Sequence, residues 1–298
     1  MKARHIALVV AAALVVLAGC GHSALRTRAA RYSVRTVREA GLSPDDQKRA
    51  DRNCVFGMPR INPKWDFGPT RFVFRDGYVL QHSSIDKVPL WVCEDVTTQQ
   101  LTGAAKRGNK FAPDPLLPPK ERAELADYKG SGYDRGHQAP AGNQAQDQRL
   151  KDETFFLSNM APQKPKLNQQ AWRELEDLTR KWTEKRGQTW QITGGMFYDP
   201  AEEDEKTADG LIEYTTIGKD NVGVPTHFYK IVAGKGPSGD WEAIAFVMEN
   251  KAYPRPFHFE QFIQSIDWIE ERTGLDFMPD LDPVEERRLE RKPSPMWQ

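Results

Sequence analysis

The chain contains the run Asp134-Arg135-Gly136-His137, followed by Ser158-Asn159-Met160-Ala161-Pro162-Gln163 and then by Leu167-Asn168-Gln169-Gln170-Ala171-Trp172. A histidine can take a proton from water near neutral pH. An asparagine offers a neutral carbonyl oxygen to a hard cation, and an arginine can bind the charge that grows on a phosphate. Together these three residue types are the parts needed to cut a phosphodiester with one divalent ion.

His137 is one of six histidines, and its sequence neighbours set it apart from the others. It lies beside Asp134 and Arg135, and Gly136 allows a close approach of the backbone. The remaining histidines of the folded part stand in apolar or aromatic surroundings, which favours structural roles; they are His82, His227 and His258. His137 is therefore the candidate general base.

Asn168 opens a predicted helix, so its structural alternative is a helix cap or a first-turn position, which Asn favours. That position is compatible with a role as metal ligand, because the start of a helix is a well-defined platform. Magnesium usually keeps several waters and shares its sites with phosphate oxygens. We therefore expect a largely hydrated ion, bound tightly only when substrate is present.

Glu176 stands eight residues after Asn168, near the same face of the predicted helix. A carboxylate there can hold a water bound to the metal. The structural alternative is a solvent-facing charge paired with Arg173 or Arg180. Arg107 lies in a polar loop thirty residues before His137, and by position alone it is one cation among several.

Strands with a few packed helices predict an α+β fold. Asp76-Gly77 between two β-rich runs indicates a hairpin, and the region 99–133, rich in Pro, Gly and Lys, is expected to be a long loop. A helix over 167–186 follows from the spacing of Trp172, Leu175, Leu178 and Trp182. The other expected strands are 71–74, 78–81, 88–96, 153–158, 190–193, 212–217, 226–232 and 241–248, with a second helix at 258–273.

The first residues have the composition of an export signal. An apolar run at 6–17 is too short to span a bilayer, which takes ~20 apolar residues. The sequence Leu17-Ala18-Gly19-Cys20 resembles the lipobox of bacterial lipoproteins, which implies cleavage before Cys20 and a lipid on it. The alternative is an ordinary signal peptide in which Cys20 is incidental. The protein is thus expected in the bacterial cell envelope, lipid-anchored through Cys20 or secreted.

The expected organisation is a signal peptide at 1–19, a polar tether at 20–52, one catalytic domain at 53–282 and a charged, extended tail at 283–298. Cys54 and Cys93 form an even pair in an exported chain, so a disulfide is the default prediction. Two buried free thiols are the alternative, because the sequence does not show how close their Cα atoms come.

The charge balance does not resemble that of a dedicated nucleic-acid binder. The chain has 42 basic and 42 acidic residues, and removal of Lys2 and Arg4 with the signal leaves 40 basic residues. Any electrostatic attraction of a polyanion must therefore be local.

The run Tyr133 to Pro140, the run Ser158 to Gln163, and the set Asn168, Trp172 and Glu176 resemble the DNA/RNA non-specific endonuclease family, over about residues 53–280. Thr193-Gly194-Gly195 and Thr273-Gly274-Leu275-Asp276-Phe277 agree with it. The resemblance implies a central, mainly antiparallel sheet flanked by helices, with a ββα-metal active-site motif. It also implies DNA and RNA as substrates, cut with little sequence preference to leave 5′-phosphates, and it allows a homodimer.

Carried over by position, the resemblance assigns His137 as general base and Asn168 as the direct protein ligand of Mg²⁺, with Mn²⁺ as an alternative. Glu176 would hold the water shell of the ion. Arg107 matches the arginine that stabilises the pentacoordinate phosphate. The supporting positions are Asp134, Arg135, which would also contact phosphate, and Asn159.

Two other functions fit the same sequence. One is a phosphodiesterase of the envelope that acts on another substrate. The catalytic residues act on the phosphodiester group and do not determine which molecule contains it. The other is an inactive nucleic-acid-binding scaffold of the same fold. The presence of His137, Asn168 and Glu176 argues against the scaffold.

Overall fold

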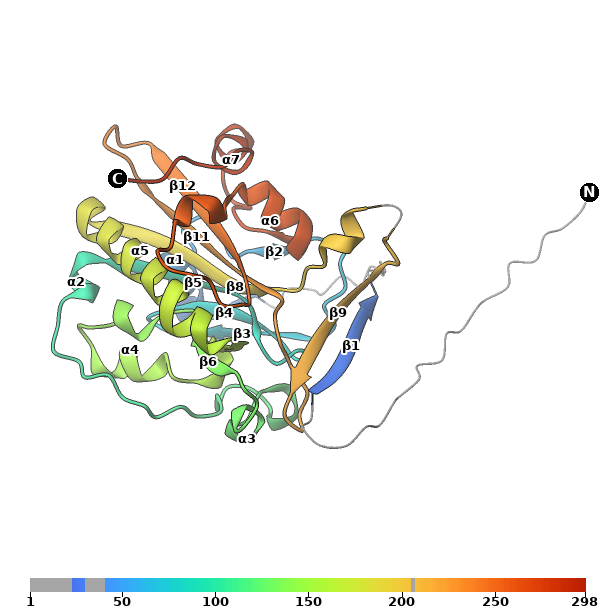
Figure 1. The fold of residues 1–298 in the computed structure, drawn as a ribbon. Helices are drawn as coiled ribbons and strands as arrows, with labels where there is room; N and C mark the ends of the chain where they lie inside the picture. The colour runs from blue at the N-terminus through green and yellow to red at the C-terminus, as the bar shows by residue number, and fades with distance from the viewer. Residues whose placement is uncertain (1–22, 30–40, 205–206) are drawn as a thin grey trace, which may run out of the picture.

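The computed structural model describes residues 23–29, 41–204 and 207–298. Its centre is a seven-stranded sheet with the order β13-β12-β11-β8-β5-β4-β3, in which neighbouring strands are antiparallel (Figure 1). This confirms the expected α+β fold with a mainly antiparallel sheet. The strands are β3 (Thr70–Phe74), β4 (Val79–Ser83), β5 (Pro89–Thr97), β8 (Gln188–Met196), β11 (His227–Lys235), β12 (Trp241–Glu249) and β13 (Ile263–Gln264).

Both faces of the sheet are apolar, since successive strand residues point to opposite sides. On one side Phe228 and Val232 of β11 share a core with Trp182 of α5 (Arg173–Arg186), the long helix that crosses the sheet in Figure 1. On the other side Ile231 packs in a core with Ile269 of α6 (Ile266–Thr273). The sheet therefore separates two cores, each covered by helices.

Most of the predicted elements are found. The hairpin forms with an Arg75 N to Tyr78 O hydrogen bond of 2.9 Å, and the strands predicted at 88–96, 190–193, 212–217, 226–232 and 241–248 are confirmed. The loop 99–133 is long but contains short helical turns. Further elements are α2 (Thr98–Leu101), η1 (Pro119–Glu121), α3 (Leu125–Tyr128), η2 (Ala141–Asn143), η5 (Pro200–Glu203), β2 (Arg60–Ile61), β9 (Leu211–Ile217), β10 (Val222–Gly223) and β14 (Leu275–Asp276).

The strand predicted at 153–158 is wrong. The segment is the end of helix α4 (Gln148–Glu153) and the start of the 3-10 turn η3 (Leu157–Asn159). Asp147 caps α4 by accepting a hydrogen bond of 3.1 Å from Leu150 N. Phe155 and Leu157 are buried in a turn, and a short apolar run does not distinguish such a turn from a strand.

The single helix predicted at 258–273 is divided. A 3-10 turn, η6 (Phe259–Phe262), leads into β13, which pairs with β12, and α6 starts only after that. Ser265 caps α6, its hydroxyl accepting a hydrogen bond of 3.2 Å from Trp268 N. The predicted end at Gly274 is confirmed, with a left-handed φ of 67°.

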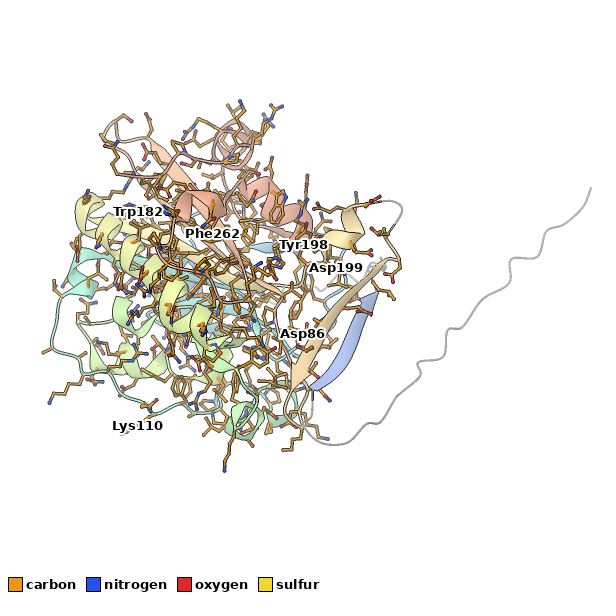
Figure 2. The ribbon with its side chains drawn as sticks, viewed as in Figure 1. Asp86, Lys110, Trp182, Tyr198, Asp199 and Phe262 are labelled. Carbon is orange, nitrogen blue, oxygen red and sulfur yellow. The ribbon has the colours of Figure 1, made fainter. Side chains whose placement is uncertain are left out.

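The extended tail predicted at 283–298 is also wrong. It begins with helix α7 (Pro283–Glu290), in which Leu289 is buried. Trp297 is buried as well, its ring centroid 5.2 Å from that of Trp182. Trp182 and Phe262, both labelled in Figure 2, belong to the same core. The last residues therefore belong to the folded domain.

At the amino-terminal end, the predicted signal at 1–19 and Cys20 lie outside the described residues. Strand β1 (Ser23–Ala29) pairs antiparallel with β9. Helix α1 (Pro44–Asn53) is capped by Ser43, so the expected boundary between 52 and 53 falls inside a helix. In the part of the chain that the structure describes, no helix is long and apolar enough to cross a membrane.

The predicted disulfide between Cys54 and Cys93 is not formed. Both cysteines are free and buried, and their thiols hydrogen-bond to each other. Burial raises the pKa of the Cys93 thiol well above its ordinary value, so Cys93 is held as a neutral thiol in an apolar core. The alternative of two buried free thiols is the one observed.

Candidate active site

The predicted catalytic segments form one ββα unit. Strand β6 (Asp134–His137) pairs antiparallel with β7 (Met160–Gln163), which places His137 opposite Met160. The chain then enters η4 (Leu167–Trp172), a π-helical stretch that continues into α5. This confirms the helix predicted at 167–186. Asn168 lies within the π-helical stretch, a local geometry that is frequent at functional sites.

Gly136 permits the close pairing of these two strands. A Cβ at this position would lie 2.3 Å from Oε1 and 2.8 Å from Cβ of Gln163 on the partner strand. No other residue fits there without moving Gln163. The glycine between Arg135 and His137 is thus required by packing.

Asn159 holds the chain that follows His137. It is fully buried, its Oδ1 accepts a hydrogen bond of 2.9 Å from Ala139 N, and its Nδ2 donates to Ala139 O at 2.9 Å. Nδ2 also donates to Thr154 O at 2.9 Å. Asn159 can therefore support the site without reaching a substrate.

One cavity of ≈ 820 Å³ brings the other predicted site residues together. Cavities of this size are typical of ligand sites. The wall includes side chains from the loop 99–133, from β6 and from the η4–α5 helix. Of the predicted residues it contains Arg107, Asp134, Arg135, His137, Asn168 and Glu176.

His137 is 8% exposed and lies against Phe111 and Phe155, whose ring centroids are 5.7 and 5.0 Å from its own. Its Nε2 has no hydrogen-bond partner among the described residues. Burial, together with the charges of Arg107 and Arg135, lowers its pKa to about 3. The imidazole is therefore neutral at pH 7 and can accept a proton.

Asn168 is oriented by Asp134. Its Nδ2 donates a hydrogen bond of 2.8 Å to Asp134 Oδ2, which also accepts one of 2.8 Å from Gln169 Nε2. This leaves Asn168 Oδ1 as the atom available to a cation. A neutral carbonyl oxygen, the Glu176 carboxylate and a cavity with room for water fit a hydrated divalent ion.

A buried charged layer lies beneath Glu176. Burial raises the pKa of Glu176, and the charges of Lys230 and Arg180 act against this. Burial also raises the pKa of Glu94 on β5 to about 7, again opposed by Lys230. Lys230 on β11 is 0% exposed, and its Nζ donates a hydrogen bond of 2.6 Å to Thr193 Oγ1.

The ion pair of Glu176 with Arg173 or Arg180, which the spacing allowed, is not among those formed by the described residues. Arg180 instead pairs with Asp177 and donates a hydrogen bond of 3.2 Å to Asn143 Oδ1. Asn143 in turn donates one of 3.0 Å to Glu94 Oε1. Glu176 is therefore available to the cavity.

The cavity is locally basic although the chain is neutral. Four basic side chains line it against two acidic ones, Asp134 and Glu176. The guanidinium of Arg135 also lies over the Phe111 ring at 4.1 Å. The basic set is Arg107, Lys129, Arg135 and Arg173. Such a wall attracts a polyanion without a basic protein as a whole.

Several of these residues were missed in the sequence. Arg173 stands three residues before Glu176 on the same helix, so helical spacing could have indicated it. Lys230 interrupts an apolar strand. Lysine is rarely buried without a compensating charge, so its position could have indicated a buried acidic partner. Nothing in the sequence pointed to Lys129 or Phe111, which reach the cavity through the fold of the long loop.

Comparisons with known proteins show the family to which the chain belongs. The family model described as DNA/RNA non-specific endonuclease matches residues 62–283. The chain is 38% identical to human mitochondrial endonuclease G over 208 residues, which are 70% of this chain and 69% of that protein. It is 33% identical to human mitochondrial nuclease EXOG over 286 residues, 94% and 74% of the two chains.

Two further matches extend this group. Nuclease C1 of Cunninghamella echinulata var. echinulata is 35% identical over 216 residues, 71% of this chain and 84% of that protein. A crystal structure of an EndoG/EndoGI complex, described as showing the mechanism of EndoG inhibition, aligns with a TM-score of 0.71 and 30% identity. It covers 80% of this chain and 94% of the matched chain.

The expected location in a bacterial cell envelope is overturned by these matches. The relatives named endonuclease G and EXOG are mitochondrial proteins, from human, bovine and nematode sources among others. They point to the mitochondrion and away from an envelope lipoprotein. The resemblance of four residues to a lipobox does not outweigh matches that extend over most of the chain.

Proposed function

Because the chain belongs to the DNA/RNA non-specific endonuclease family, we propose that its cavity hydrolyses phosphodiester bonds of DNA and RNA with Mg²⁺ and leaves 5′-phosphates. The chain is a nuclease of a metal-dependent family; the choice of Mg²⁺, with Mn²⁺ as an alternative, and the residue roles are proposals. The observation that carries them is the meeting of His137, Asn168 and Glu176 with Arg107 and Arg135 in one cavity.

His137 is the proposed base. Its imidazole lines the cavity, is neutral at pH 7 and accepts the proton of the water that attacks phosphorus. The aromatic rings of Phe111 and Phe155 limit the positions open to the imidazole. The resting imidazole is already neutral, and it releases the proton that it gains before the next turnover.

Arg107 and Arg135 are the proposed phosphate contacts. Neither forms an ion pair within the described part of the chain, so their guanidinium groups are available to an anion. Their charges reach His137, which places them close to the base. Arginines near the reacting group stabilise the negative charge that develops on the phosphate.

Asn168, through Oδ1, and Glu176, through water, are the proposed holders of the divalent ion. The bound ion would offset the negative charge of the phosphate and of the departing 3′ oxygen. Asp134 keeps Asn168 in place by its 2.8 Å hydrogen bond. These proposed contacts are all to the phosphate group, so they do not distinguish one base from another. Cleavage with little sequence preference follows from this.

The test is digestion of supercoiled plasmid and of RNA by the purified protein with Mg²⁺ and, in parallel, with EDTA. Wild type should cut both substrates only with the ion. His137→Ala should lose about 10²–10⁴ of the rate. His258→Ala, which removes an exposed histidine outside the cavity, should match wild type. Undiminished cutting by His137→Ala would exclude His137 as the base.

The homodimer allowed by the resemblance stays a prediction. Light scattering would give the mass of the particle, to be compared with 33.9 kDa for one chain.

A further inference from the structure

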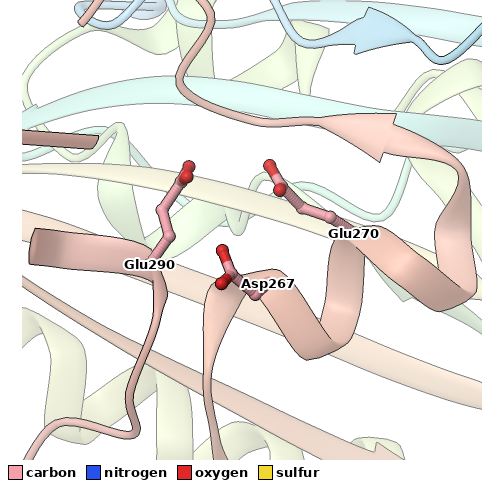
Figure 3. A group of neighbouring side chains, drawn as sticks. All are labelled: Asp267, Glu270 and Glu290. Carbon is pink, nitrogen blue, oxygen red and sulfur yellow. The ribbon is translucent and has the colours of Figure 1, made fainter. Parts of the chain in front are cut away.

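A second group of carboxylates lies on the side of the sheet opposite α5. Asp267 and Glu270 come from α6, and Glu290 is the last residue of α7. One oxygen of each lies within 4.8 Å of the others. Figure 3 shows the three carboxylate groups turned toward one another. None of the three lines the cavity that contains His137.

Glu290 is the member that indicates a missing ligand. It is only 4% exposed, and its Oε1 is buried without a hydrogen-bond partner among the described residues. Burying a carboxylate without a partner costs several kcal/mol in proteins, so such groups are normally paired or bound to metal. The unpartnered oxygen belongs to a side chain that points into the group.

The surrounding charges do not compensate the group. None of its three carboxylates takes part in an ion pair of the described residues. Asp276 and Glu286 add further negative charge, and Arg291 opposes it at Asp267. Burial and these acidic neighbours raise the pKa of Glu270 to about 8 and that of Glu290 to about 9.

We propose that Asp267, Glu270 and Glu290 bind one Ca²⁺ ion at a site separate from the active site. Ca²⁺ takes oxygen ligands at ~2.3–2.6 Å in a flexible geometry, so two oxygens on one ion lie up to ~5.2 Å apart. The observed spacing falls within this limit. Asp267 and Glu270 are partly exposed, which leaves room for water to complete the ligand shell.

The site joins α6 and α7, whose Ile269 and Leu289 belong to the same apolar core. Glu270 is fixed on one side, since its Oε1 accepts a hydrogen bond of 2.7 Å from Phe277 N. After Glu290 the chain runs to Trp297, which packs against Trp182 and lies under the guanidinium of Arg186 at 3.7 Å. The ion would thus anchor the segment that contacts α5, the helix of Glu176.

Thermal unfolding of the full chain, stripped of metal with EDTA and then dialysed, tests this site without any activity measurement. Ca²⁺ at about 100 times its dissociation constant should raise the Tm of wild type by roughly 5–10 °C. Glu290→Gln, which keeps the shape and cannot become a carboxylate, should abolish the rise. Asn168→Ala, which disables the proposed active-site ligand, should keep it.

Calorimetric titration of Ca²⁺ into Asn168→Ala should show one site, and adding Glu290→Gln should remove it. No rise in Tm for wild type, or an equal rise in Glu290→Gln, would overturn the proposal. So would loss of the rise in Asn168→Ala, because the ion would then be the one in the cavity. A larger rise with Mg²⁺ than with Ca²⁺ would overturn the choice of ion. If Glu290→Gln does not fold, Asp267→Asn makes the same test.

Discussion

The two acidic regions of this protein differ in where their positive charge comes from. Beneath the cavity, the charge of the fully buried Lys230 acts on the buried Glu94 and on the half-buried Glu176. At the other side of the sheet, the charged groups that act most on Glu270 and Glu290 among the described residues are all acidic. A buried carboxylate is stable when the chain supplies the cation, and where it does not, the place is open to an ion from solution.

The largest effect should come from removing the internal cation. Lys230→Met removes the cation whose charge acts on the buried Glu94 and the half-buried Glu176. Leaving a buried carboxylate without its compensating charge costs about 3–5 kcal/mol of the free energy of unfolding. Urea denaturation would measure this. Lys235→Met, which removes an exposed lysine of the same strand, is the matched control. Equal losses in the two variants would show that Lys230 is not the compensating charge.

A smaller effect should follow from removing one acid as well. Glu94→Gln in the Lys230→Met background should restore part of the lost stability, because the amide needs no cation and Asn143 still lies beside it. The coupling between the two substitutions is expected at about 0.5–3 kcal/mol. Additive losses in the double-mutant cycle would mean that the two residues do not interact.

The smallest effect at neutral pH is expected from Glu290→Gln in the presence of EDTA. With a pKa of about 9 in the fold, Glu290 carries its proton at pH 7, so the amide should change the free energy of unfolding by less than about 1 kcal/mol. Because this pKa is raised above its ordinary value of 4.5, the protonated group stabilises the fold at low pH. That stabilisation is lost as the pH rises toward 9.

Wild type should therefore lose stability between about pH 5 and pH 9, and Glu290→Gln should lose less over the same range. The groups that face Glu290 and add to the effect are Glu270, Asp267, Asp276 and Glu286. Urea midpoints at pH 5, 7 and 9 would measure it. Parallel curves for the two proteins would contradict the raised pKa.

Local patterns were sufficient to predict much of this fold. The Asp76-Gly77 hairpin, the strands with apolar alternation and the helix at 167–186 depend on neighbouring residues, and the structure contains them. The ββα unit and six residues of the cavity wall, Arg107, Asp134, Arg135, His137, Asn168 and Glu176, followed from the resemblance, because the spacing of His137 and Asn168 is specific. The exact roles of those residues remain predictions.

The failures have a common physical cause, which is contact between distant parts of the chain. Strand β13 exists because Ile263 pairs with Phe246 of β12, and the apolar spacing of 258–273 does not show this. The tail belongs to the folded domain because the Trp297 ring packs against the Trp182 ring. Phe155 is buried in a turn, since the cavity wall and not a sheet covers it. Cys54 and Cys93 approach as thiols, which their positions in the sequence leave open.

The anchoring of Trp297 has a practical consequence for handling the protein. An affinity tag fused after Gln298 would begin one residue from a buried ring that supports α5. Trimming the chain to the stretch shared with the family, which ends at residue 283, would delete that ring together with α7 and uncover Trp182. Purification handles therefore belong at the other end of the molecule, and truncated forms would be poor substitutes for the full chain in crystallisation or screening.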